Sequence, residues 1–250
     1  MIDVLITGIG GKMGEAVRTI LENDDKARVV CGVDLHAPEN CKVPVYKTFA
    51  EIKEKVDVIV DFSSPAVVTE ELEWAVKNKV PAVLAATGYT ADDIEYIDGC
   101  SEKIAIFRTA NFSLGVNLLV KLVNQAAKTL GENFDIEIIE RHHNKKADAP
   151  SGTALMLADS ANQAFGNSKE LLNGRSGIVG KRGNEIGIHA VRGGTIVGEH
   201  EVCFAGDDEI ITLCHSARSK RVFAAGAVKA AKWLAGKKCG KYDMNDVLDI

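Results

Sequence analysis

The sequence contains no apolar run that approaches the roughly 20 residues needed to span a bilayer, and it has no excess of basic residues. Lysine and arginine together number 30 against 35 aspartates and glutamates, which gives a net charge of −5. Nucleic-acid binding needs clustered positive charge that neutralises phosphates. We therefore expect a water-soluble chain that binds neither a membrane nor a nucleic acid.

The cysteines and the first residues also lack known signals. No two of the six cysteines form a CxxC pair, and their spacing matches no zinc site, so we expect free thiols and no bound metal. The chain begins Met1-Ile-Asp-Val-Leu-Ile, without a basic segment or a small-residue cleavage site, so no signal peptide is expected. Both absences are typical of a cytoplasmic protein.

The first half of the chain alternates strand and helix patterns. Its strands are continuous apolar runs rather than alternating ones, which is typical of a parallel sheet covered by helices on both faces. This order predicts a doubly wound, Rossmann-like α/β domain. The expected strands are 2–7, 27–34, 57–61, 82–86 and 104–108, and the expected helices are 12–23, a segment near 50–55, 65–78 and 91–101.

The pattern changes after residue 112. Helix patterns at 114–130 and 152–165 flank a strand at 135–140, and the segments 186–191, 195–204 and 209–215 alternate apolar and polar residues as antiparallel strands do. We expect a second, α+β domain with a mixed or antiparallel sheet over residues 113–222. A helix at 223–234 and a tail at 243–248 then return to the first domain, which comprises 1–112 and 223–250.

A glycine-rich loop, T-G-I-G-G-K-M-G, occupies residues 7–14 between the first strand and the first helix. Glycines there allow a tight turn and a close backbone approach to a pyrophosphate at the helix start. Asp34 ends the second strand, 20 residues after Gly14, where an acid accepts hydrogen bonds from the adenosine ribose. A carboxylate there repels a 2′-phosphate, so NADH is the expected cofactor and NADPH a possible one.

The segment 140–154 reads E-R-H-H-N-K-K-A-D-A-P-S-G-T-A. Adjacent histidines and lysines follow a strand, and Pro-Ser-Gly-Thr then starts a helix whose amides and hydroxyls suit a carboxylate. Histidine and lysine supply proton transfer and positive charge at neutral pH. The pattern predicts a site for an anionic substrate with a general acid.

At this segment the sequence resembles the 4-hydroxy-tetrahydrodipicolinate reductase (dihydrodipicolinate reductase) family of the diaminopimelate route to lysine. The resemblance extends over nearly the whole chain. Further matching motifs are G-I-G-G-K-M-G in the glycine loop, D-F-S-S-P at 61–65, A-T-G-Y at 86–89, A-N-F-S-L-G-V-N at 110–117, G-T-I-V-G-E-H at 194–200 and Y-D-M-N-D-V-L at 242–248.

The resemblance implies a role for individual residues. His142 would be the catalytic acid/base and Lys146 a second proton donor, and the carboxylates of a cyclic dicarboxylate substrate would bind to His143, Ser151, Gly152 and Thr153. The implied cofactor contacts are Gly8, Ile9, Gly10, Gly11, Lys12, Met13, Asp34, Ala85, Ala86, Thr87, Thr109, Ala110, Asn111 and Phe112. Family members are usually homotetramers joined through the sheet of the second domain.

The chain departs from the family pattern at two places. Leu35 stands where NADP-tolerant relatives often carry arginine, which favours NADH, and Ala85 and Ala86 replace a common glycine and threonine. Two other functions remain open: another two-domain NAD-linked dehydrogenase of amino-acid metabolism, or a sensor that binds NAD without turnover. A sensor would not need the acid and the lysine of the 142–146 segment.

Overall fold

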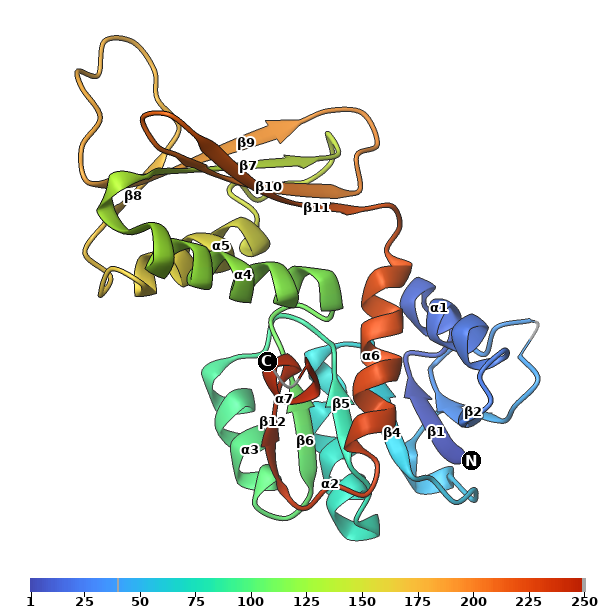
Figure 1. The fold of residues 1–250 in the computed structure, drawn as a ribbon. Helices are drawn as coiled ribbons and strands as arrows, with labels where there is room; N and C mark the ends of the chain where they lie inside the picture. Colours follow the sequence, from blue (N-terminus) through green and yellow to red (C-terminus); the bar gives the residue numbers. More distant parts are fainter. Residues whose placement is uncertain (40, 249–250) are drawn as a thin grey trace. The chain divides into compact units, whose positions relative to one another are not determined.

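The computed structural model describes residues 1–39 and 41–248 (Figure 1). The chain divides into two compact units, and each is described by itself. The dinucleotide unit combines Met1–Ser113 with Arg221–Ile250, and the inserted unit comprises Leu114–Lys220. No helix within the described ranges is both long and apolar enough to cross a membrane.

The dinucleotide unit is built on a sheet of parallel strands in the order β12-β6-β5-β4-β1-β2-β3. The chain reverses its direction of travel across the sheet between β1 and β4, and ligands of such sheets bind beyond the carboxyl ends of the strands at that point. The strands are β1 (Ile2–Thr7), β2 (Ala27–Val33), β3 (Val45–Tyr46), β4 (Val58–Asp61), β5 (Ala82–Leu84), β6 (Ala105–Arg108) and β12 (Gly240–Tyr242).

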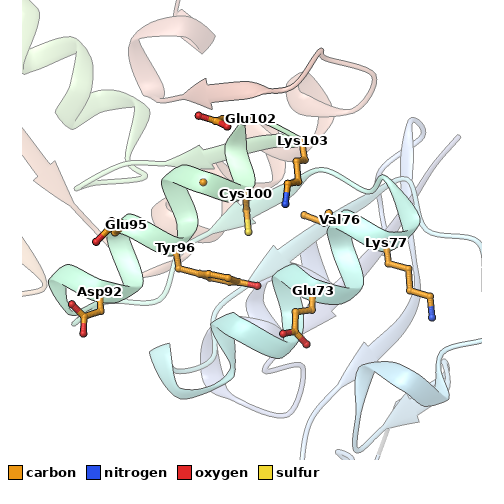
Figure 2. A pocket seen from close by; sticks show the side chains of 10 residues that line it. Glu73, Val76, Lys77, Asp92, Glu95, Tyr96, Cys100, Glu102 and Lys103 are labelled. Carbon is orange, nitrogen blue, oxygen red and sulfur yellow. The ribbon is translucent and has the colours of Figure 1, made fainter.

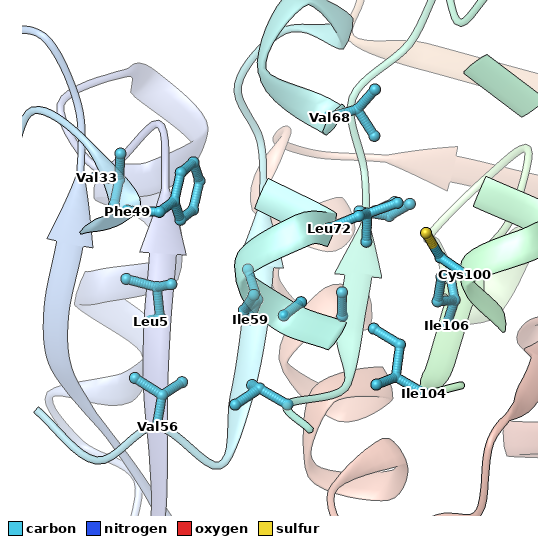
Figure 3. Close-up of a cluster of buried hydrophobic side chains, with 14 of the residues drawn as sticks. Leu5, Val33, Phe49, Val56, Ile59, Val68, Leu72, Cys100, Ile104 and Ile106 are labelled. Carbon is cyan, nitrogen blue, oxygen red and sulfur yellow. The ribbon is translucent and has the colours of Figure 1, made fainter. Parts of the chain in front are cut away.

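Helices cover both faces of this sheet (Figure 1). On one face α1 packs against α6, and on the other α2 and α3 enclose a core cluster that includes Leu5, Ile59 and Ile106 (Figure 3). The helices are α1 (Lys12–Leu21), α2 (Val68–Asn78), α3 (Ala91–Ser101), α6 (Arg221–Leu234) and α7 (Met244–Leu248), with short 3-10 turns η1 (Phe49–Glu51) and η2 (Pro65–Val67).

The inserted unit has a sheet in the order β11-β10-β7-β9-β8 with both of its α-helices on one face. Alternate residues such as Ile136, Ile138, Val202 and Phe204 point into the core beneath the helices. The elements are α4 (Leu114–Leu130), η3 (Gly131–Asn133), β7 (Asp135–His142), α5 (Gly152–Gln163), β8 (Glu170–Asn173), β9 (Glu185–Arg192), β10 (Gly198–Ala205) and β11 (Ile210–Ala217).

The predicted fold class is confirmed, as a parallel Rossmann-like sheet with helices and a second, mixed sheet. Two details of the prediction are wrong. The helix expected near 50–55 is only the turn η1, which ends at Glu51 because Ile52 has extended backbone dihedrals. The segment expected at 186–191 as an antiparallel strand is β9, which pairs parallel with both β7 and β8.

Candidate active site

The glycine loop joins β1 to α1 at the carboxyl edge of the parallel sheet. Gly8 has a φ of +77°, which favours glycine. A Cβ at Gly14 would lie 2.2 Å from the Gly8 carbonyl oxygen, so only glycine lets the helix approach the loop this closely. No side chain caps the first turn of α1, which begins at Lys12 and Met13. The uncapped amides and the positive end of the helix dipole fit a pyrophosphate.

Asp34 follows β2 and contacts this loop directly. Its Oδ2 accepts a hydrogen bond from the Gly10 amide at 2.9 Å, and its Oδ1 accepts one from the His36 amide at 3.0 Å. Each carboxylate oxygen keeps a lone pair for a further donor. The next side chain, Leu35, is 73% exposed and offers no positive charge to a 2′-phosphate.

The other predicted cofactor residues follow neighbouring strands. Ala85–Thr87 come directly after β5, and Thr109–Phe112 come after β6. The Phe112 ring is buried against Phe107, with ring centroids 5.8 Å apart. Because β5 and β6 run parallel, both segments lie at the same edge of the sheet as the glycine loop.

Sequence reasoning assigned no cofactor contact to Phe62 and Ser63, which the structure places beside the glycine loop. A Cβ at Gly8 would lie 3.0 Å from the Phe62 carbonyl oxygen and 3.1 Å from the Ser63 Cα. Both residues follow β4 at the switch point of the sheet. The signal that could have found them is the D-F-S-S-P motif directly after a predicted buried strand.

A groove of about 800 Å³ lies between α2 and α3 in the same unit. Tyr96 and Cys100 project from α3 toward α2, among exposed charged side chains such as Glu73 and Lys103 (Figure 2). None of the predicted site residues lines this groove, and it lacks the glycine-rich backbone that the candidate nucleotide site provides.

In the inserted unit, the Glu140 carboxylate is fully buried and binds three donors. His142 Nδ1 lies 2.7 Å from Oε2, the Ser151 amide donates to Oε1 at 2.9 Å, and the Arg192 guanidinium donates to both oxygens at 2.7 and 2.8 Å. Burial by itself would raise the Glu140 pKa, but Arg192, His142 and the Ser151 amide together hold it below its usual value. Glu140 is therefore an ionised carboxylate behind the His142 ring.

The second buried histidine of this cluster is His200. Its Nε2 lies 2.9 Å from Ser151 Oγ, which also accepts from the Ala154 amide as the cap of α5. Its ring meets that of His142 edge to face, with centroids 5.2 Å apart. Burial, and then the nearby His142, lower the pKa of His200 to about 4, so this imidazole is neutral at physiological pH.

The remaining predicted substrate residues surround the start of α5 and the turn before it. Lys146 Nζ pairs with the exposed Asp148 carboxylate at 2.8 Å. His143 is half-buried, and its Nδ1 has no hydrogen-bond partner in the described part of the chain. Gly152 and Thr153 are the first residues of α5, where the positive end of the helix dipole favours an anion.

Gly198 lies beside the other ring nitrogen of His142, Nε2. A Cβ at Gly198 would lie 3.0 Å from His142 Nε2, so glycine at this position leaves room for that atom.

No group of three or more His, Cys, Asp or Glu residues within 1–39 and 41–248 is placed to hold a metal ion.

The family is decided by two matches, described as dihydrodipicolinate reductase N-terminus over residues 2–112 and dihydrodipicolinate reductase C-terminus over residues 115–248. This chain belongs to the dihydrodipicolinate reductase family. It is 49% identical over 249 residues to a protein of Caldanaerobacter subterraneus subsp. tengcongensis named 4-hydroxy-tetrahydrodipicolinate reductase, covering 99% of this chain and 98% of the relative.

Two further reductases of the family support the assignment. The 4-hydroxy-tetrahydrodipicolinate reductase of Clostridium novyi is 43% identical over 248 residues, with 99% of this chain and 98% of the relative covered. The dipicolinate-bound dihydrodipicolinate reductase of Paenisporosarcina sp. TG-14 has a TM-score of 0.81 and 27% identity, covering 97% of each chain. The resemblance seen in the sequence is thereby confirmed.

Proposed function

We propose that this chain reduces 4-hydroxy-tetrahydrodipicolinate to tetrahydrodipicolinate with a nicotinamide nucleotide, in the diaminopimelate route to lysine. The observation that carries the proposal is the buried Glu140–His142 pair beside the start of α5, in a chain whose relatives are named for this reduction. The Met1–Ser113 and Arg221–Ile250 segments bind the nucleotide, and Leu114–Lys220 binds the substrate and forms the subunit contacts.

The nucleotide binds at the carboxyl edge of the parallel sheet and supplies the hydride. The amides of Lys12 and Met13 at the start of α1 hold its pyrophosphate, and Asp34 accepts the adenosine ribose hydroxyls. Ala85–Thr87 and Thr109–Phe112 border its nicotinamide half. NADH is preferred over NADPH, because Asp34 repels a 2′-phosphate and Leu35 provides no compensating charge.

His142 acts as the general acid through Nε2. Because Nδ1 donates to the ionised Glu140, the ring keeps one tautomer and Nε2 is the atom that exchanges a proton with the substrate. Glu140 also stabilises the imidazolium form. Hydride addition places electron density on the substrate ring. The protonated His142 and the Lys146 ammonium stabilise this negative charge and then supply the proton that neutralises it.

The substrate carboxylates bind at the start of α5. The amides of Gly152 and Thr153 and the positive end of the helix dipole favour an anion there. His143 adds a further donor from the turn before the helix. Ser151 contributes mainly by holding the helix start, because its hydroxyl is buried and already bonded to Ala154 and His200.

A coupled assay that generates the unstable substrate in place and follows NADH and NADPH separately tests this function. His142→Gln is expected to lower kcat by roughly 10²-fold or more, with little change in the Kd for NADH. Lys146→Gln is also expected to lower kcat, whereas Lys145→Gln, a change at the exposed neighbour, serves as the matched control. Turnover of aspartate semialdehyde or aspartate in place of the dipicolinate-route substrate would overturn the proposal.

The cofactor preference has its own test. Asp34→Ala removes the ribose acceptor and the charge that repels a phosphate, so it is expected to weaken NADH binding and to improve NADPH binding in relative terms. His36→Ala is the control, because only its backbone amide contacts Asp34. An unchanged ratio of the two Kd values would remove Asp34 from this role.

We propose further that the chain forms a cytoplasmic homotetramer through the second face of the β11-β10-β7-β9-β8 sheet. Both α-helices of this unit lie on the other face, and the second face presents Ile139 and Val191 among paired charges such as Arg141 with Glu201. A helix-free sheet face with apolar residues is suited to another subunit. Sedimentation equilibrium that gives a monomer at micromolar concentration would contradict the tetramer.

A further inference from the structure

The D-F-S-S-P motif begins with a buried acid that has no place in the mechanism above. Asp61 is the last residue of β4 and is 1% exposed. Its Oδ1 accepts hydrogen bonds from the Ser63 amide at 2.7 Å and the Ser63 hydroxyl at 2.5 Å, and its Oδ2 accepts one from the Tyr89 hydroxyl at 3.3 Å. One carboxylate thus connects the segment after β4 to the segment after β5.

A second buried acid, Glu71, lies in α2 near Asp61. It is fully buried, and neither of its carboxyl oxygens has a hydrogen-bond partner of normal geometry among the described residues. The buried Thr7 Oγ1 also has no hydrogen-bond partner of normal geometry among the described residues. An ionised carboxylate without partners is very costly to bury, and a neighbouring charge of the same sign adds to that cost.

The two acids therefore differ in charge. Burial, and then the negative charge of Asp61, raise the Glu71 pKa well above its usual value, against a small opposite effect of Thr7. Burial raises the Asp61 pKa as well, but its hydrogen bonds from Ser63 and Tyr89 oppose that shift. The net shift of the Asp61 pKa is upward, but Asp61 has three hydrogen-bond donors and Glu71 has none of normal geometry. We therefore assign the proton of the pair to Glu71 and the negative charge to Asp61.

The position of the pair in the sheet relates it to one half of the nucleotide. Thr7 and Asp61 are register partners on β1 and β4, at the switch point of the sheet. Asp34, the proposed ligand of the adenosine ribose, follows β2, so we place the adenosine half of the nucleotide on the β2 side of the switch point. The nicotinamide half then extends in the other direction, over the ends of β4 and β5, where the Ser63 and Tyr89 segments lie.

We propose that Asp61 is a positioning residue for the nicotinamide half of the nucleotide, and that Glu71 beside it remains a neutral acid. Asp61 does not touch the nucleotide. Asp61 fixes the distance between the Ser63 segment and the Tyr89 segment, and both segments border the nicotinamide. The neutral Glu71 lets a single negative charge remain at this edge without repulsion from a second one. This inference rests on the proposed function only for the identity of the nucleotide.

The test compares two ligands across matched variants. Isothermal titration gives the Kd of NADH and of ADP-ribose, which lacks only the nicotinamide. Asp61→Asn keeps the size of the side chain but replaces one acceptor oxygen by a donor, so it is expected to raise the Kd for NADH about tenfold and to leave that for ADP-ribose within about twofold. Glu71→Gln, a neutral isostere of the protonated acid, is the matched control and is expected to change neither Kd by more than about twofold.

Tyr89→Phe keeps the inference testable if Asp61→Asn fails to fold. It removes one of the three donors to Asp61 without changing charge, and it is expected to raise only the Kd for NADH, by about threefold. Equal losses for NADH and ADP-ribose, an unchanged Kd for NADH in both variants, or an effect of Glu71→Gln as large as that of Asp61→Asn would each overturn the inference. Failure of the proposed function is seen separately, as NADH binding without turnover of the dipicolinate-route substrate.

Discussion

Two glutamates of this protein are equally buried, with no exposed surface. Glu140 lies in the inserted unit and Glu71 in the dinucleotide unit, and their pKa values are shifted in opposite directions. Glu140 has a lowered pKa because it binds an arginine, a histidine and a backbone amide. Glu71 has no such partners and lies near another acid, so its pKa is raised. Burial alone does not decide the charge of a carboxyl group, whereas its partners do.

The difference also separates their roles. An ionised acid behind a histidine orients the ring and stabilises its protonated form, so Glu140 fits the proton transfer that we propose for His142. A neutral acid below the candidate nucleotide site contributes mainly packing, and it has a single proton to donate. Replacing each glutamate by glutamine should therefore be severe at one position and mild at the other.

The largest effect is expected from Glu140→Gln. The glutamine amide removes the negative charge and can present a donor to His142 Nδ1, which would favour the wrong tautomer, so kcat should fall about 10³-fold with little change in the Kd for NADH. Steady-state kinetics and titration of NADH measure both quantities, and Glu170→Gln at an exposed position of β8 is the control. Normal turnover by Glu140→Gln would show that the pair does not transfer a proton.

Removal of the cation that compensates Glu140 should mainly affect stability. Arg192→Met leaves a buried carboxylate without its strongest partner, so the free energy of unfolding should fall by about 3 kcal/mol. Urea unfolding at pH 7 measures this change. Arg218→Met, at an exposed position after β11, should change it by less than about 0.5 kcal/mol. Similar small losses in both variants would mean that Glu140 is not held as an ion by Arg192.

The pH dependence of stability tests the charge of Glu71. Above the unfolded pKa of about 4.3, the folded chain keeps a proton on Glu71 that the unfolded chain releases. Rising pH therefore destabilises the wild type by up to about 1.4 kcal/mol per pH unit until the raised folded pKa is reached. The glutamine of Glu71→Gln does not titrate. The free energy of unfolding of this variant, relative to that of the wild type, should therefore increase between pH 5 and 7.

The control for that titration is Glu73→Gln, the same substitution at an exposed position on the same helix, measured at the same pH values. A difference between Glu71→Gln and the wild type that stays constant with pH would mean that the Glu71 pKa is not raised in the folded chain, and that the contrast with Glu140 is wrong.

The smallest effect is expected at the open side of His142. Gly198→Ala places a methyl group 3.0 Å from His142 Nε2, so the ring must shift by a few tenths of an ångström and kcat should fall by about threefold to tenfold. The control is Gly193→Ala, because a methyl group at that position meets no neighbouring atom within 4 Å. Gly194→Ala is unsuitable as a control, because Gly194 has a positive φ. Equal kinetics for Gly198→Ala and the wild type would show that Nε2 has more freedom than the structure indicates.

The long, strongly patterned elements of the fold were predictable from the sequence. Helices α3 and α4 have the predicted bounds, Ala91–Ser101 and Leu114–Leu130. The short strands β3, β8 and β12 were not predicted, because two to four residues carry too little periodicity. The parallel pairing of β9 could not be foreseen, since side chains alternate in the same way in parallel and antiparallel strands.

The candidate site was predictable to the same extent. His142 and Lys146 were proposed from the 140–154 motif and the family resemblance, and their roles stay predictions. The two-residue period of a strand could also have placed Glu140 on the same face as His142. Arg192 had no such signal, because it reaches Glu140 through the β7–β9 pairing that sequence reasoning misjudged. His200 lies opposite Glu140 on β10, a pairing that only the folded sheet reveals.

The return of the chain to its first unit has a consequence for synthesis on the ribosome. Strand β12 pairs with β6 through Gly240 and Ala105, and α6 packs on α1 and on three strands of the same sheet. The N-terminal segment therefore emerges long before the residues that complete its sheet and cover one of its faces. The inserted unit is a compact unit made of one continuous segment, Leu114–Lys220, so it can finish folding first. The sheet that carries the candidate nucleotide site is thus completed last, although its glycine loop is among the first segments to be made.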